Sequence, residues 1–279
     1  MFEEKTLSCW GEFEEEVNEI RRGVLPGYKN ELLFRGQANS EWKLRPTLFG
    51  FDGWENAKSL NEYIRLAGEG LAQIESATEF RFNVPDDDFK AAGTSSLVPI
   101  EKRHEALWSY LVFLRHYGFP SPLLDWSQSQ YVAAYFAFSA RPASSLEKDV
   151  SIYVLKYCTY NSYKKSEKIL RGARFPFLLG QYIRANLRHF MQQSEYSICM
   201  ECRNFTPASK SVDWILSSYE DDGSEVARCS DSRIYKYCLP RAERKNVLKM
   251  LDRMNVNGFT LFGNPAGLMD ALAVRSFEL

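Results

Sequence analysis

The chain has 279 residues, and its content of 45% hydrophobic and 25% charged residues is typical of a globular protein with a substantial core. The formal net charge of −1 excludes a global basic field of the kind that favours tight binding to duplex nucleic acid. The first residues are too polar for a signal peptide, and no apolar run is long enough for a membrane span. We therefore expect a cytoplasmic protein without a membrane partner.

From the N-terminus, apolar residues spaced by three and four predict a helix over residues 6–22, which Pro26 and Gly27 end. A short apolar strand is predicted over residues 31–35. Helical spacing returns at residues 54–81 and 101–117, and the segment between them, rich in Pro, Asp and Gly, is predicted to be an exposed loop. The next predicted elements are a strand at 123–126, a polar turn at 127–129 and an apolar helix at 130–139.

The second half of the chain continues to interleave short strands with helices. Strands are predicted over residues 149–157, 195–201 and 234–239, helices over 177–191 and 241–255, and a turn or strand over 257–262. This order predicts an α+β fold, with a mixed β-sheet core flanked by helices. Because no segment has the composition of a linker, we expect a single domain over residues 1–279.

The six cysteines are expected to be free thiols, since a cytoplasmic protein rarely keeps disulfides. Cys199 and Cys202 have the two-residue gap of a zinc knuckle or redox motif, and no second pair with suitable spacing lies nearby, although Cys229 and Cys238 could complete a site. The alternation around Cys199 favours a strand. We therefore expect no metal.

Arg35 follows an apolar strand and directly precedes Gly36. An arginine in this position is often a surface residue in a salt bridge. A guanidinium at the tip of a buried strand is also well placed to bind a phosphate or carboxylate through two hydrogen bonds. Gly36 is expected to leave room for a ligand near the backbone. These residues are our first candidate for a binding site.

His116 and Asp125 form the second candidate. A lone histidine at the end of a helix is more often a cap or a core residue than a catalyst. Only a short connection containing Pro120 and Pro122 separates the two residues, so a His–Asp hydrogen bond is conceivable. The neighbours of Asp125 are apolar, and a carboxylate in such surroundings is paired or functional.

These segments carry a resemblance to a known family. Three segments resemble the motifs of the FRG domain family: Phe34-Arg35-Gly36-Gln37, His116-Tyr117-Gly118 and Leu123-Leu124-Asp125-Trp126-Ser127. Gly258-Phe259-Thr260-Leu261-Phe262 and Gly267-Leu268 are similar to its usual ending. The resemblance spans residues 31–272, with an unmatched insertion near 52–100 and a helical segment before it.

The FRG family in turn resembles ADP-ribosyltransferases, which implies an ADP-ribosyltransferase-like fold that uses NAD as a substrate. The resemblance assigns Arg35 to the NAD phosphates, and Gly36, Gln37, Tyr117 and Ser127 to the same site. It assigns Gln193 and Glu195 to catalysis, because residues two apart on a strand share a face and a carboxylate stabilises an oxocarbenium-like transition state. FRG relatives usually have Gln-x-Gly-x-Phe here, which aligns instead with Gln192, Ser194 and Tyr196.

The leading hypothesis is an NAD-dependent ADP-ribosyltransferase that modifies a macromolecule. We favour single-stranded RNA or DNA as the acceptor over a protein, in a toxin or phage-defence role with an inhibitory, antitoxin-like partner. The alternative is a non-catalytic module that binds a nucleotide or a protein in a groove around Arg35. A weaker alternative is a hydrolase or nuclease centred on His116 and Asp125, since the chain has three histidines and no recognised hydrolase motif.

Overall fold

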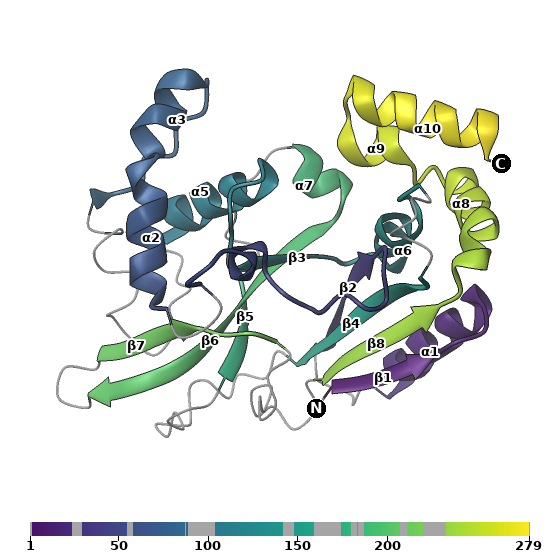
Figure 1. Cartoon of the computed structure of the whole chain (residues 1–279), viewed down its shortest axis with the longest axis horizontal. Coiled ribbons are helices and arrows are strands. Elements are labelled where there is room, and N and C mark those ends of the chain that lie inside the picture. The colour runs from purple at the N-terminus through teal and green to yellow at the C-terminus, as the bar shows by residue number, and fades with distance from the viewer. Residues whose placement is uncertain are drawn as a thin grey trace.

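The computed structural model describes residues 2–23, 30–54, 58–86, 88, 104–141, 148–158, 174–179, 183, 187–206, 211–219 and 233–278. In this part of the chain eight strands form one sheet, which runs through the whole molecule (Figure 1). The neighbouring strands are antiparallel except for the first pair, which is parallel. The strand order is β1 (Phe2–Thr6), β8 (Arg233–Leu239), β4 (Val150–Cys158), β2 (Asn30–Gln37), β3 (Leu123–Ser127), β6 (Ser194–Thr206) and β5 (Arg174–Leu178), with β7 (Ser211–Leu216) also paired to β6.

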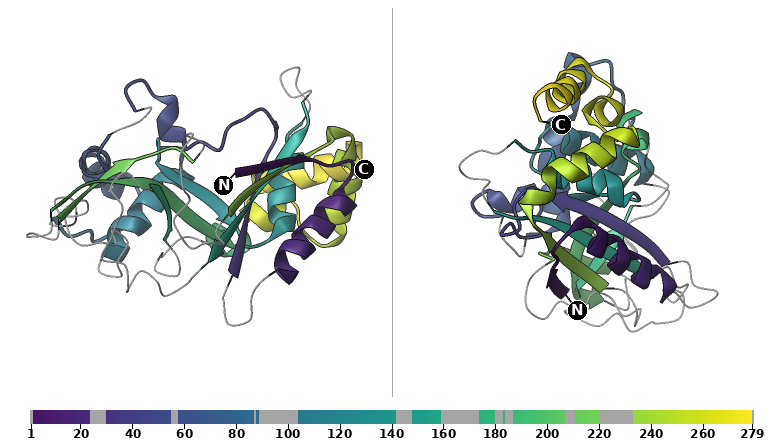
Figure 2. Two further views of the ribbon diagram at one scale, coloured as in Figure 1. Left: turned by 90° about the horizontal axis from the view of Figure 1, so that it is seen from below. Right: turned by 90° about the vertical axis from the view of Figure 1, so that its right-hand side faces the viewer.

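The described helices gather in two groups (Figures 1 and 2). One group lies at the β1–β8–β4 end of the sheet and comprises α1 (Trp10–Arg22), α6 (Gln130–Phe138), α8 (Arg244–Arg253), α9 (Gly258–Phe262) and α10 (Pro265–Phe277). The other lies at the β5–β7 end and comprises α2 (Leu60–Glu69), α3 (Leu71–Ala77) and α5 (Glu105–His116). The short α7 (Leu187–Met191) lies between the two groups and contacts α9 (Figure 1). Within the described residues no helix combines the length and apolar character needed to cross a membrane.

Each group of helices covers its own hydrophobic core, so the molecule has two lobes on one sheet. Phe34, Ile152 and Val154 pack against α1, α6 and α8 in the first lobe. Tyr196 and Ile198 pack against α2 and α5 in the second. A third core lies on the opposite face of the sheet and joins the two halves, with Leu33, Leu44, Trp126, Tyr153 and Leu155 among its members.

The sheet is weakest between β2 and β3. These strands pair only at Phe34 and Ser127, whereas β2 pairs with β4 along its whole length. Beyond this one pair the two strands diverge. The divergence leaves the side chains of Arg35, Gln37 and Trp126 around an opening in the middle of the molecule.

Gly36 lies at the closest approach of β2 to α6. A Cβ atom at this position would come within 1.9 Å of the Ala133 carbonyl oxygen and 2.6 Å of the Ala137 backbone nitrogen. The glycine is therefore needed for helix packing. The expectation that Gly36 leaves room for a ligand near the backbone stays a prediction, since α6 fills only the space where a Cβ atom would lie.

Several predicted elements are confirmed, with shifts at their ends. The strands predicted at 31–35, 123–126, 149–157, 195–201 and 234–239 lie within β2, β3, β4, β6 and β8. The helix predicted at 54–81 is two helices that meet at Gly70, and the helix predicted at 101–117 is α5. The α+β fold with a mixed sheet flanked by helices is confirmed. Most of the loop predicted at 83–96 lies outside the described residues.

The C-terminal half contains the main corrections. The helix predicted at 177–191 is wrong: β5 ends at Leu178, and only α7 is helical within the described part of that span. Pro176 fits β5 because this strand is at the edge of the sheet, where a missing N–H is tolerated. The turn or strand predicted at 257–262 is helix α9, which a reciprocal capping box between Asn257 and Thr260 begins. Strands β1 and β7 and helix α10 were not predicted.

Candidate functional site

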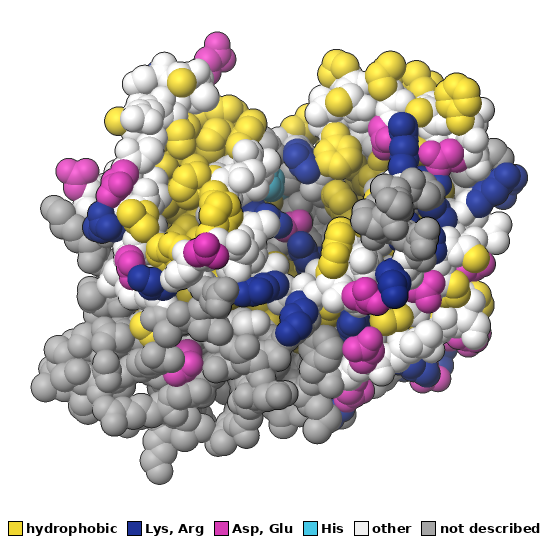
Figure 3. All heavy atoms as spheres, viewed as in Figure 1, with side chains coloured by type: hydrophobic (Ala, Val, Ile, Leu, Met, Phe, Trp, Pro, Cys, Tyr) yellow, Lys and Arg dark blue, Asp and Glu magenta, His cyan; other side chains and the backbone are white. Residues whose placement is uncertain are grey.

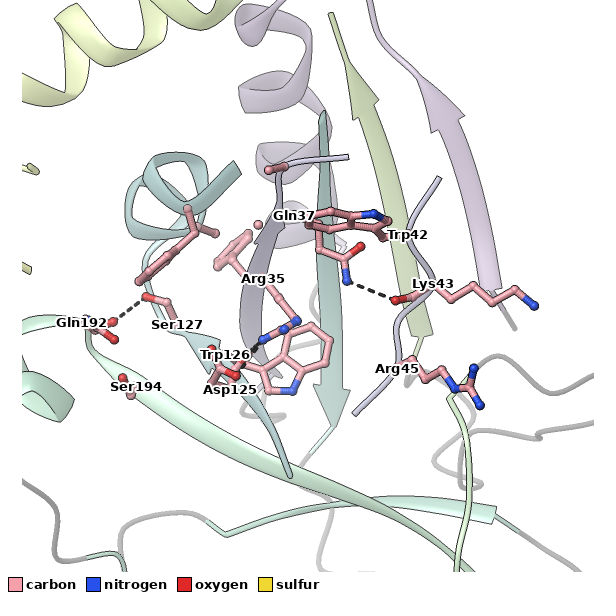
Figure 4. A pocket seen from close by; sticks show the side chains of 15 residues that line it. Arg35, Gln37, Trp42, Lys43, Arg45, Asp125, Trp126, Ser127, Gln192 and Ser194 are labelled. Atoms are coloured by element: carbon pink, nitrogen blue, oxygen red, sulfur yellow. Dashed lines mark hydrogen bonds and ion pairs between the residues drawn. The ribbon is translucent and has the colours of Figure 1, made fainter. Parts of the chain in front are cut away.

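A cavity of about 400 Å³, here called the Arg35 pocket, lies where β2 and β3 diverge (Figure 4). Its wall comes from the end of β2, the end of β3, the start of β6 and one side of α6. The loop after β2 closes the remaining side. Its lining residues are Phe34, Arg35, Gly36, Gln37, Ala38, Trp42, Lys43, Arg45, Asp125, Trp126, Ser127, Ala133, Phe136, Gln192 and Ser194.

A charge network joins β2, β3 and α5 at the pocket. Arg35 Nη1 lies 2.9 Å from Asp125 Oδ1 and donates to the Asp125 backbone carbonyl at 2.7 Å. Arg115 binds the same carboxylate oxygen from the other side, through Nη2 at 2.7 Å and Nε at 3.2 Å. Burial raises the pKa of Asp125, but the two guanidiniums outweigh burial and hold the pKa well below its usual range. Asp125, which was predicted to be paired or functional, is paired.

The rim of the pocket is basic and carries an aromatic ring. Lys43 and Arg45 lie in the loop that closes the pocket, with their charged ends directed outward, and the half-exposed Trp42 lies beside Gln37 (Figure 4). These rim residues were not predicted as site residues. The signal for them is the alternation after β2, in which Lys43 and Arg45 flank the buried Leu44.

Gln37 has an unused acceptor at the pocket. The residue is 8% exposed, and its Nε2 donates to the Lys43 carbonyl at 3.2 Å. Its Oε1 has no hydrogen-bond partner among the described residues, and neither does the buried Nε of Arg35. A buried polar atom without a partner is energetically unfavourable, so these two atoms mark places where a ligand can bind.

Ser127 ties the end of β3 to the start of β6. Its hydroxyl donates to the Gln192 carbonyl at 2.8 Å and accepts from the Ser129 backbone N–H at 3.0 Å. Gln192 is itself buried, and its Nε2 donates to the Leu261 carbonyl at 3.1 Å. The pocket is thus connected to α9 through side-chain hydrogen bonds.

Gln193 and Glu195 do not share a strand face. Gln193 precedes β6 in a turn, where its φ of 47° is left-handed. Glu195 pairs with Trp126, so its side chain lies on the face of the sheet opposite to its neighbour Ser194. Its Oε1 accepts from Gln128 Nε2 at 3.1 Å. The geometric prediction for this pair is wrong.

Gln192 and Ser194 line the Arg35 pocket instead of Gln193 and Glu195. These are the residues that the FRG pattern Gln-x-Gly-x-Phe aligns with, and Tyr196 continues the same face. The FRG alignment of this segment stays a prediction. The catalytic roles of Gln193 and Glu195 stay predictions.

His116 and Asp125 take different partners. His116 Nε2 lies 2.8 Å from the Tyr196 hydroxyl, which also lies 3.2 Å from His189 Nδ1. The predicted His–Asp hydrogen bond is therefore wrong, since Asp125 binds the two arginines. Burial, followed by the positive charge of Arg188, lowers the pKa of His116 to about 4, and burial also lowers the pKa of His189. Both imidazoles are neutral at pH 7.

Tyr117 lies outside the Arg35 pocket. It ends α5 as the C-cap, 63% exposed, with its ring centroid 4.4 Å from that of Phe113. Gly118 follows with a φ of 86°, and Phe119 N–H donates to the Leu114 carbonyl at 3.0 Å, which completes a Schellman motif. The predicted cap glycine is confirmed, whereas a direct role for Tyr117 in the Arg35 pocket is not supported by its position.

The burial of His116 predicts acid sensitivity. Because the folded pKa of about 4 lies below the unfolded value of about 6.5, the unfolded chain binds more protons between these values. The contribution of neutral His116 to the free energy of unfolding is therefore fully present above pH 6.5, and it is lost as the pH falls toward 4. From pH 7 to 4.5 we expect this group to contribute a loss of roughly 2–3 kcal/mol.

Urea unfolding at pH 7 and 4.5 tests this expectation, with His116→Gln as the matched variant. The wild type should lose more stability than the variant between the two pH values. The Asp125 carboxylate adds its own loss only as the pH falls through the unfolded value of about 3.9, below this window. Equal losses in the two proteins would contradict the assignment to His116.

Other predicted features have simpler outcomes. Cys9 and Cys238 are free thiols, and Cys199 lies on strand β6 as predicted. Cys229 lies outside the described residues. Within the described ranges no group of three or more His, Cys, Asp and Glu residues is arranged to hold a metal ion.

Comparison with known proteins identifies one family. The family model of the FRG domain matches residues 30–145, a segment that runs from β2 through α5 and β3 to α6. No curated protein and no solved structure matches the chain significantly. The similarity expected for residues 258–268 lies beyond the match and stays a prediction. Arg35, Arg115 and Asp125, which form the charge network of the pocket, all lie within the matched segment, and over residues 30–145 the chain is similar to the FRG domain.

Proposed function

We propose that the Arg35 pocket binds a nucleotide through its phosphates. The observation that carries the proposal is the presence of Arg35, with its unpartnered Nε, and of the unpartnered Gln37 Oε1 in one cavity, which a loop bearing Lys43 and Arg45 closes. Guanidinium and ammonium groups bind phosphates through charge-assisted hydrogen bonds. Trp42 at the rim offers a ring face on which a flat base can stack.

The size and chemistry of the pocket agree with such a ligand. Its volume of about 400 Å³ is in the range of small-molecule sites, which is roughly 300–1,000 Å³. Its single carboxylate, Asp125, is bound by two arginines, so the pocket as a whole attracts anions. NAD is the nucleotide that we propose first, because the resemblance to ADP-ribosyltransferases implies it.

ADP-ribosyl transfer is the reaction proposed for bound NAD. Loss of nicotinamide leaves an oxocarbenium-like ribose, which a carboxylate stabilises. Asp125 is the carboxylate that lines the pocket, whereas Glu195 lies one residue beyond the lining residue Ser194 on the other face of β6. The geometry thus supports nucleotide binding more directly than transfer. A module that binds a nucleotide without reaction is the second candidate, and the fixed ion pairs of Asp125 favour it.

Arg35→Lys tests the binding proposal. Lysine keeps a positive charge beside Asp125 but loses the planar fork, so NAD should bind at least about tenfold more weakly, in line with about 1.5–3 kcal/mol for hydrogen bonds to charged groups. Calorimetric titration with NAD measures the affinity. Arg65→Ala on α2 is the control, because Arg65 is exposed and pairs only with Glu69 among the residues that the structure describes. Equal NAD affinity for wild type and Arg35→Lys would rule out Arg35 as the anchor.

Incubation of the wild type with labelled NAD separates transfer from binding alone. Transfer predicts release of nicotinamide and label on single-stranded RNA, single-stranded DNA or protein. It also predicts toxicity on expression, which a neutralising partner would relieve. If NAD binds and stays intact with every acceptor, the pocket is a binding module and the transferase proposal is wrong.

A further inference from the structure

Arg188 is a cation that the Arg35 pocket does not use. It lies on α7, and its guanidinium stacks on the Phe262 ring at 4.6 Å from the ring centroid. Its buried Nε has no hydrogen-bond partner, and no carboxylate pairs with it, among the residues that the structure describes. Burial lowers the pKa of this guanidinium, so its charge is held at a cost to folding. Such an arginine is suited to bind an anion from outside the chain.

Arg188 faces the end of α5 across a hollow. Its charge lowers the pKa of His116, and Asp125, Tyr196 and Tyr117 in turn raise the pKa of Arg188. The hydrogen bonds agree, because the Tyr196 hydroxyl lies 2.8 Å from His116 Nε2 at the end of α5 and 3.2 Å from His189 Nδ1 on α7, next to Arg188. Figure 3 shows the hollow between the two lobes, with Lys and Arg side chains along its floor and a histidine among them.

An aromatic cluster, formed by Phe80, Phe113 and Tyr117, lies at the end of α5. The ring centroids of Phe113 and Tyr117 are 4.4 Å apart, and those of Phe80 and Phe113 are 4.8 Å apart. Tyr117 is 63% exposed and Phe80 is 41% exposed. Exposed rings beside a cation are a surface on which flat groups can stack.

We infer that the surface formed by the aromatic cluster, Arg115 and Arg188, beside the hollow between the lobes, binds a segment of single-stranded nucleic acid. Phosphates contact the guanidinium of Arg188, and bases stack on Tyr117. A single strand fits because its bases are free to stack, whereas those of a duplex are already stacked on each other. The inference deepens the proposed function, since Asp125 links Arg115 to Arg35 and the strand would lie beside the nucleotide as the second substrate.

The combination of groups favours nucleic acid over an acidic peptide. A peptide rich in Asp and Glu would neutralise the arginines but leave Phe80 and Tyr117 without a partner. A nucleotide chain supplies both a negative charge and a flat ring in every unit. The formal net charge of −1 then predicts binding of moderate strength that depends on salt.

Two matched pairs of variants test the inference. Oligonucleotides of about 12 nucleotides, within the site sizes of about 4–16 for single-strand binding folds, are labelled with fluorescein and titrated without NAD. Tyr117→Ala should weaken binding about tenfold, while Tyr117→Phe keeps the ring and the affinity. Arg188→Ala should weaken binding and lower the slope of log affinity against log salt by about 0.7. Arg188→Lys should keep most of that slope.

Separate arms with RNA and DNA of the same sequence show which sugar is preferred. Arg65→Ala is the control and should bind like the wild type. Melting temperatures check that Arg188→Ala, which loses its packing on Phe262, stays folded; if it does not, Arg188→Lys and the two Tyr117 variants carry the test.

Unchanged affinity in both Tyr117→Ala and Arg188→Ala would overturn the inference, as would a wild type that binds neither oligonucleotide. Tighter binding of an oligo-glutamate peptide than of either oligonucleotide would assign the surface to a protein partner instead. The oligonucleotide is titrated in the absence of NAD. Failure of NAD binding would therefore contradict the proposed function without affecting the test of oligonucleotide binding.

Discussion

Asp125→Asn is expected to lower the free energy of unfolding by about 2–3 kcal/mol. The substitution removes the charge that Arg35 and Arg115 share, and leaves two guanidiniums facing each other. Breaking a fully buried pair typically destabilises by about 3–5 kcal/mol. Asp125 lies deep in the molecule, but the pocket leaves 44% of its side-chain surface accessible, and the water there screens part of the repulsion.

Urea unfolding at pH 7 measures the effect, with Glu69→Gln as the control. Glu69 forms an exposed pair with Arg65, so its loss should change stability by no more than about 0.5 kcal/mol. In the double variant Asp125→Asn with Arg115→Met, part of the loss should be recovered because only Arg35 remains at the site. A change below about 0.5 kcal/mol in Asp125→Asn would show that the charge network contributes little to the fold.

Gly36→Ala is expected to destabilise the protein by roughly 3 kcal/mol or more, at the upper end of overpacking effects. The added methyl would lie 1.9 Å from the Ala133 carbonyl oxygen, and backbone atoms cannot rotate away as a side chain can. Either β2 or α6 must therefore move. Since both elements line the Arg35 pocket, NAD affinity should fall with stability.

Gly50→Ala is the matched control for this change. Gly50 ends the 3-10 helix η1 (Thr47–Gly50), and no atom lies within 4 Å of a Cβ built there. The free energy of unfolding of the Gly50→Ala protein should therefore stay within about 0.5 kcal/mol of the wild-type value. Thermal unfolding of both variants compares them directly. A Gly36→Ala protein as stable as Gly50→Ala would mean that α6 does not pack against β2 as closely as the structure describes.

The sequence by itself determined those elements whose signal is local. The amphipathic spacing of α1 and the apolar runs of β2 and β3 identified these segments without tertiary information. It also selected Arg35 and Asp125, because a cation at a strand end and a carboxylate among apolar neighbours are unusual at single positions. The pairing of Asp125 followed from that argument, but its partner did not.

Only the tertiary structure decided which residues share the pocket. A shift of one residue at the start of β6 moves every side chain to the other face, so the order Gln192-Gln193-Ser194-Glu195 fits two assignments equally well in sequence. The register with β3 places Ser194 opposite Ser127, and thereby puts Ser194 in the pocket. The divergence of β2 from β3, which opens the pocket, is also a tertiary feature. It depends on packing between segments far apart in the sequence, and Arg35 and Asp125, which are in contact there, are 90 residues apart. No local pattern encodes such a contact, because its energy comes from burial and charge pairing that exist only after the lobes have assembled.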